Sequence, residues 1–175
     1  MPARWVVISM DGLAVSSLGA FGASWNETPT IDRMAAWGTV WDRAICTSDD
    51  PASLLAGLWA QRLDAGTWLE GWKRRGRVEL FLGAGDQATA LAELAGQIGF
   101  DQCTIVETIA NSLHRSDEHD APADEVEDAA LSQLLLPLLE RIGMSGRADA
   151  KSESSDWSML WVHGDLLTRH WDAPR

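Results

Sequence analysis

Acidic and hydroxyl side chains follow two predicted strands in the first third of the chain. Asp11 comes directly after the apolar run 6–10, and Thr47 and Ser48 come just before a predicted helix that Pro51 opens. A carboxylate at a strand end can bind a hard divalent cation, and a hydroxyl beside such a cation can act as a nucleophile. These residue types indicate a metal-assisted ester hydrolase with Asp11 as a metal ligand. The alternative roles are structural: an Asp that accepts backbone N–H groups at a turn, and hydroxyls that cap a helix.

Four further side chains near predicted strand ends can take part in the same chemistry. Asp49 and Asp50 precede the helix that begins at Pro51, so each is a candidate metal ligand or a helix cap. His163 and His170 flank the segment after the last predicted strand, where either can bind a metal or hydrogen-bond a substrate oxygen. A histidine at a strand end is often structural, so both interpretations stay open.

Strands and helices alternate along the chain, which predicts a mainly parallel sheet covered by helices on both faces. The almost continuous apolar run 4–10 predicts a strand that is buried on both faces. Ligands of such sheets gather beyond the carboxyl ends of the strands, where Asp11, Thr47, the turn 83–85 and His163 are expected. Strands are predicted at 4–10, 40–45, 78–82, 104–106 and 159–162, and helices at 29–37, 52–60, 67–74, 86–97 and 126–142.

Proline and capping residues mark several helix boundaries. Thr28 is a good N-cap residue, and Pro29 suits the first helical position. Asp86 is expected to cap the helix 86–97. Pro137 lies inside the predicted helix 126–142 and is expected to kink or split it.

Composition indicates one globular domain over residues 1–175. The segment 143–156 is rich in small and polar residues, and we expect it to form a mobile loop. The chain is 46 % apolar, and its formal charge of −12 argues against a nucleic-acid partner. No apolar run reaches membrane-spanning length, so no membrane association is expected. The N-terminus lacks the layout of a signal peptide, which predicts a cytoplasmic protein.

Several motifs together resemble one enzyme family. They read VISMDGL at 7–13, LGAFG at 18–22, TPTIDRMAAWG at 28–38 and LLAG at 54–57, followed by WVH at 161–163 and HWDAP at 170–174. This set resembles the sulfatases of the alkaline phosphatase superfamily, which typically read DDLRPDxLGCYG…TPNLDRLAAEG over the first span. The spacing inside 28–38 is the most specific part of the resemblance.

The resemblance implies a three-layer α/β/α sandwich with a mainly parallel central sheet, as in alkaline phosphatase. It also implies a divalent metal (Ca, Mg or Zn) and hydrolysis of small anionic sulfate or phosphate esters through a covalent intermediate. Counting back without gaps from the segment 54–57 places Thr47 on the nucleophile position. The resemblance leaves Asp11 as the metal ligand, Asp49 or Asp50 as a substitute ligand, and His163 or His170 as the substrate contact.

The sequence also departs from the sulfatase pattern. Gly12 replaces the second metal-binding Asp, and the chain ends before the later metal ligands of sulfatases, so we expect a truncated domain with weak or no turnover by itself. The alternative is a non-catalytic, degenerate relative that acts as a binding module. In a third arrangement, a separately encoded second chain completes the fold. A homo-oligomer is a further expectation for partners.

Overall fold

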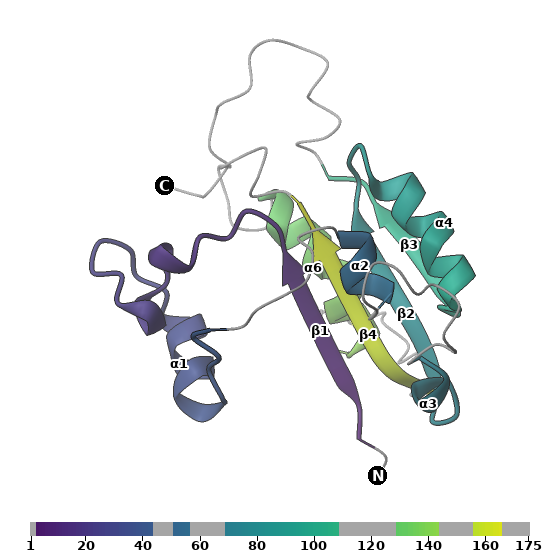
Figure 1. Ribbon diagram of the computed structural model, residues 1–175, viewed down its shortest axis with the longest axis horizontal. Coiled ribbons are helices and arrows are strands. Elements are labelled where there is room, and N and C mark those ends of the chain that lie inside the picture. The colour runs from purple at the N-terminus through teal and green to yellow at the C-terminus, as the bar shows by residue number, and fades with distance from the viewer. Residues whose placement is uncertain (1–2, 44–50, 57–68, 109–128, 144–155, 166–175) are drawn as a thin grey trace.

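The computed structural model describes residues 3–43, 51–56, 69–108, 129–143 and 156–165. These residues contain a four-stranded sheet in which all neighbouring strands are parallel, in the order β1-β4-β2-β3 (Figure 1). An α/β fold with a parallel sheet is therefore confirmed, and the alkaline-phosphatase-like arrangement stays a prediction. The strands are β1 (Trp5–Met10), β2 (Arg77–Gly83), β3 (Gln102–Val106) and β4 (Trp157–Gly164).

Helices cover both faces of this sheet. Side chains alternate between the faces along each strand, so apolar side chains on both faces pack against helices. Leu80 and Leu82 of β2 lie in a buried cluster on one face, and Phe81 lies in a second cluster on the other. Leu91 joins the first cluster and Leu134 the second. The first face carries α2 (Pro51–Ala56), α3 (Glu70–Lys73) and α4 (Ala88–Ile98), and the second carries α6 (Ala130–Arg141).

The predicted burial of the first strand on both faces is wrong. β1 is an edge strand that pairs with β4, and Val6 and Ile8 remain 44 % and 45 % exposed. Val6 pairs with Leu160 and Ile8 with Val162, so these side chains lie on the face that carries α6. Since α6 packs against β4 and β2, that face of β1 stays exposed.

The strand predicted at 40–45 is absent from its described part, residues 40–43. Val40 and Trp41 have no regular secondary structure, and Asp42 and Arg43 form a turn. All four residues are exposed, and none pairs with the sheet. The strand prediction for these residues is wrong because a strand also needs a neighbour for its backbone N–H and C=O groups. Residues 44–45 lie outside the described residues.

A separate hydrogen-bonded unit holds the two N-terminal motifs together. Thr28 Oγ1 accepts a hydrogen bond from the Gly19 backbone N–H and donates one to Asp32 Oδ1, both at 2.9 Å. The Ala20 backbone N–H also donates to Asp32 Oδ1, at 2.7 Å. Thr28 is the predicted N-cap of the helix that begins at Pro29. Its hydroxyl binds residues of two segments and does not accept a hydrogen bond from a backbone N–H of that helix. The elements joined are η1 (Val15–Ser17), η2 (Gly19–Phe21) and α1 (Pro29–Trp37), of which α1 has no buried residue.

The remaining predicted helices match described helices with shifted starts. α3 begins at Glu70, and α4 begins at Ala88 with Gln87 at its N-cap, so Asp86 is not the cap. α6 continues through Pro137, so the predicted split does not occur. Most of the segment 143–156, predicted to be a mobile loop, lies outside the described residues.

Candidate functional site

A pocket of about 230 Å³ lies at the carboxyl edge of the sheet. Its lining includes Asp11, which follows β1, and His163, near the end of β4. This is the edge at which parallel sheets of this class bind ligands. The other lining residues are Leu82 and Gly83 of β2, Asp165 after β4, Pro51 of α2, and Gln87, Ala88 and Leu91 at the start of α4.

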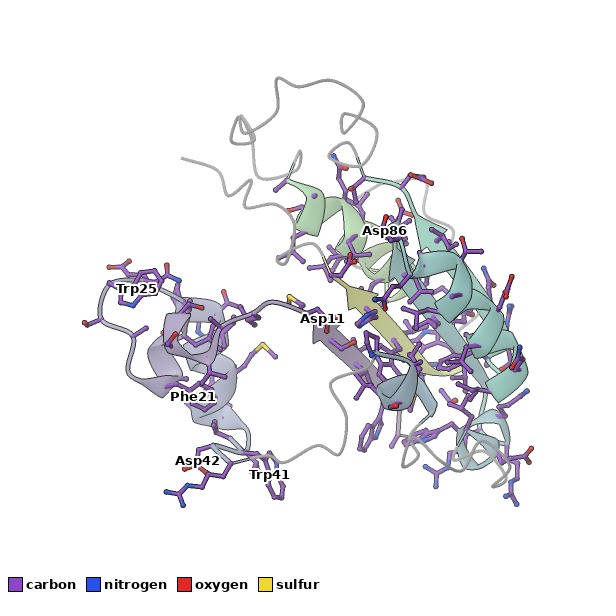
Figure 2. All side chains as sticks on the ribbon, turned by 45° about the horizontal axis from the view of Figure 1, so that its top comes forward. Asp11, Phe21, Trp25, Trp41, Asp42 and Asp86 are labelled. Carbon is purple, nitrogen blue, oxygen red and sulfur yellow. The ribbon has the colours of Figure 1, made fainter. Side chains whose placement is uncertain are left out.

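Backbone pairing between β1 and β4 brings Asp11 to this pocket. Ser9 pairs with His163 and Met10 with Gly164, and the Asp11 N–H then donates to the Gly164 carbonyl oxygen at 2.9 Å. Gly12 follows with φ = +80°, a conformation that glycine adopts without strain, so the chain turns away directly after Asp11. Figure 2 shows Asp11 at the end of β1.

His163 is buried, with 4 % of its surface exposed, and it belongs to a hydrogen-bonded group that sequence reasoning missed. Its Nδ1 lies 2.9 Å from Ser9 Oγ, and the Trp161 indole N–H donates to the same oxygen at 2.8 Å. A signal for this group was present in the sequence. Ser9 precedes Asp11 by two residues, and Trp161 precedes His163 by two, so each pair shares one face of its strand.

Burial sets the protonation of His163. Loss of solvent lowers the pKa of its imidazole, while the negative charges of Asp11 and Asp165 act in the opposite direction and raise it. Because the net direction is downward from an ordinary value of 6.5, the ring is neutral at about pH 7. Asp165 is thus a further charged group of the pocket, and sequence reasoning did not single it out.

The pocket provides donors of the type that a divalent cation needs, but the described residues do not complete a metal site. Carboxylate oxygens such as those of Asp11 suit Mg²⁺ or Ca²⁺, and a mixed carboxylate and imidazole set suits Zn²⁺. Among the residues that the structure describes, no group of three His, Cys, Asp or Glu side chains is arranged to hold one ion. Asp11 therefore fits as one ligand, and a bound ion would need others.

Two of the six predicted site residues, Asp11 and His163, fall within the described residues, and both line this pocket. Four do not: Thr47, Asp49, Asp50 and His170 lie outside the described residues. Pro51, which directly follows the Thr47–Asp50 segment in the sequence, lines the pocket.

The fold and the pocket define the chain as an α/β protein with a candidate ligand site at the carboxyl edge of a parallel sheet. No protein-family model, curated protein or solved structure matches the chain. No helix in the described parts of the chain has the length and apolar character needed to cross a membrane.

Proposed function

We propose that the chain is a sulfatase-like, metal-dependent hydrolase of sulfate or phosphate esters, with its site in this pocket. One observation carries the proposal: Asp11, directly after β1, and His163, near the end of the neighbouring parallel strand β4, line the same pocket, and the sequence indicates both for this chemistry. The N-terminal motifs of the sulfatase resemblance add support, because the Thr28 hydroxyl hydrogen-bonds to both Gly19 and Asp32. We further propose an alkaline-phosphatase-like arrangement and a cytoplasmic location.

In this proposal each polar side chain has one role. Asp11, together with Asp49 or Asp50, would hold the divalent cation, which would stabilise negative charge that develops on the ester group. Thr47 Oγ1 loses its proton to water and attacks the sulfur or phosphorus atom. The bond from that atom to the leaving alcohol oxygen breaks as this oxygen takes up a proton from water, so the proton count balances. Water then cleaves the Thr47 ester and releases sulfate or phosphate. His163 hydrogen-bonds an oxygen of the anionic group.

The other lining residues support a small ester with an apolar alcohol part. Leu82, Ala88 and Leu91 give the lining of the pocket an apolar part in addition to its acidic side chains. A volume of about 230 Å³ is at the small end for ligand pockets, which commonly measure about 300–1,000 Å³. Aryl phosphates and aryl sulfates are therefore the appropriate first substrates.

The test is hydrolysis of an aryl phosphate and an aryl sulfate by the full chain, with Mg²⁺, Ca²⁺ or Zn²⁺ added in turn. We expect Thr47→Ala to lower kcat on the order of 10³-fold or more, because it removes the nucleophile. Thr39→Ala is the matched control, since Thr39 is an exposed threonine after α1. Equal rates for the two variants would contradict the proposed role of Thr47.

Exposed tryptophans favour a second candidate function, a non-catalytic binding module. Trp25, Trp37 and Trp41 are exposed in or beside α1, and Figure 2 shows Trp25 and Trp41 away from the sheet. Aromatic side chains are enriched in protein interfaces. A protein partner, a second copy or a second chain that completes the fold would then cover this surface. Metal-free protein without ester hydrolysis, together with concentration-dependent self-association in solution, would favour this candidate.

A further inference from the structure

The hydroxyl of Ser9 lies between two aromatic nitrogens beside the pocket. Ser9 Oγ is 2.8 Å from Trp161 Nε1 and 2.9 Å from His163 Nδ1. Strand register fixes this arrangement, because Ser9 pairs with His163 across β1 and β4 and Trp161 lies two residues earlier on the same face of β4. Trp161 and His163 are both buried, so water does not compete freely for these groups.

Donor and acceptor chemistry gives these hydrogen bonds a direction. An indole N–H can only donate, so Ser9 Oγ accepts from Trp161. The single hydroxyl proton of Ser9 can then be directed to His163 Nδ1, at 2.9 Å, or to the Val162 carbonyl oxygen, at 3.4 Å. Hydroxyl hydrogen bonds to oxygen are commonly about 2.5–3.0 Å long, so the contact to Val162 is the weaker one. The proton of Ser9 therefore points to His163 Nδ1.

A neutral imidazole that accepts at Nδ1 carries its own proton on Nε2. Because Ser9 binds Nδ1, the Nε2–H group on the opposite edge of the ring is the one that can bind a ligand in the pocket that His163 lines. An N–H group suits an anionic oxygen there, and it also offsets the repulsion of an anion by Asp11 and Asp165.

We propose that Ser9 and Trp161 are positioning residues that hold His163 with its proton on Nε2, so that the ring donates a hydrogen bond to a sulfate or phosphoryl oxygen. His163 then acts as a donor to the ligand and not as a metal ligand or a general base. The identity of the ligand rests on the proposed function, whereas the proposed tautomer rests on the shorter contact of Ser9 Oγ to His163 Nδ1 than to the Val162 carbonyl oxygen.

The direct test is the tautomer of His163 in the full chain labelled with ¹⁵N-histidine. Long-range ¹H–¹⁵N correlation spectra at about pH 8, above the ordinary histidine pKa, distinguish a proton on Nδ1 from one on Nε2. His163→Gln identifies the signal by its loss. We expect the wild-type ring to carry its proton on Nε2, and a proton on Nδ1 would overturn the proposal without any variant.

Variants test whether Ser9 and Trp161 cause this preference. Ser9→Ala and Trp161→Phe are expected to give a mixture of tautomers, whereas Ser9→Thr keeps the hydroxyl and the wild-type spectrum. Ser158→Ala is the matched control, because Ser158 is a buried serine on β4 whose hydroxyl donates to the Trp72 carbonyl oxygen at 2.9 Å. It is expected to lower stability and leave the tautomer unchanged. A wild-type spectrum in Ser9→Ala would overturn the positioning role.

Binding of inorganic phosphate and inorganic sulfate tests the ligand. Ser9→Ala is expected to weaken binding about 10-fold, the lower end of the 10–100-fold that is typical when a residue that orients a metal ligand is lost, and Ser9→Thr should restore it. Absence of phosphate and sulfate binding by the wild-type chain would overturn the donor role. If His163 carries its proton on Nε2 and binding of phosphate or sulfate depends on Ser9, but no ester is hydrolysed, the proposed function is contradicted and this inference is not. Hydrolysis with an unaltered tautomer in Ser9→Ala would contradict this inference alone.

Discussion

The Asp11 backbone N–H donates a 2.9 Å hydrogen bond to the Gly164 carbonyl oxygen. This bond extends the hydrogen bonding between β1 and β4 by one residue beyond Met10, the last residue of β1. The chain then turns at Gly12, so Asp11 is held at the pocket that His163 lines. Chemistry that needs a carboxylate and an imidazole together therefore depends on one pair of neighbouring strands.

The buried imidazole of His163 predicts a loss of stability at mildly acidic pH. Because burial lowers the pKa of His163 in the folded state, the unfolded state binds more protons as the pH falls through about 6.5. The free energy of unfolding should therefore decrease as the pH falls toward the lowered pKa. Urea unfolding at about pH 7.5 and pH 5.5, in metal-free buffer, measures this change. The decrease should be smaller in His163→Gln, and an equal decrease in both proteins would assign the effect to other groups.

A buried ion pair joins α6 to the sheet. Arg141 Nη2 and Nε donate to the two carboxylate oxygens of Glu79, at 2.8 and 2.9 Å, and Glu79 on β2 is almost fully buried. Arg141→Met leaves this carboxylate without its principal partner and should cost about 3–5 kcal/mol in urea unfolding.

Two further variants make this stability prediction specific. The double variant Glu79→Leu with Arg141→Met should recover much of the loss, because no buried charge remains. Lys73→Met removes the partner of Asp101 in a partly exposed pair at 3.4 Å, and should cost about 1 kcal/mol or less. A similar cost for Arg141→Met and Lys73→Met would contradict the importance of burial.

Substitution by alanine is expected to have opposite effects on stability at Gly19 and Gly96, because the space for a Cβ differs between them. A Cβ at Gly19 would collide with the Asp32 carboxylate, whereas one at Gly96 would meet no other atom within 4 Å. Gly19→Ala should therefore destabilise the unit of η2 and α1 by about 1–3 kcal/mol. Gly96→Ala should stabilise α4 by about 1 kcal/mol, because alanine is the better helix former. Amide hydrogen exchange in α1 and α4 measures both effects, and faster exchange in α4 of Gly96→Ala would contradict the second.

The sequence predicts the elements of this fold better than their packing. The apolar runs that form β1, β2 and β4 are visible because strands of a parallel sheet are apolar and short. The exposure of β1 depends on its position at the edge of the sheet and on the packing of α6 against β4 and β2. Both are set by tertiary contacts. Similarly, the residue types at 40–45 do not reveal that residues 40–43 have no strand beside them.

The same division holds for the candidate site. Asp11 and His163 were predictable because each has a reactive side chain at a strand end. Ser9 and Trp161 acquire their roles only from the register that pairs Ser9 with His163, and register requires knowledge of which strands are neighbours. Asp165 becomes part of the pocket in the same way, through its position directly after β4.

The most direct test of the account is metal-dependent hydrolysis of an aryl phosphate by Asp11→Asn compared with Asp42→Asn. Both variants lose one carboxylate charge, but Asp11 lines the pocket and Asp42 lies in an exposed turn, far from Asp11 in Figure 2. Asp11→Asn should lower the rate at least about 100-fold, because even outer partners of metal ligands commonly contribute 10–100-fold. Asp42→Asn should match the wild type. Equal rates in the two variants, or a wild-type rate that does not change when divalent cations are chelated, would contradict the account.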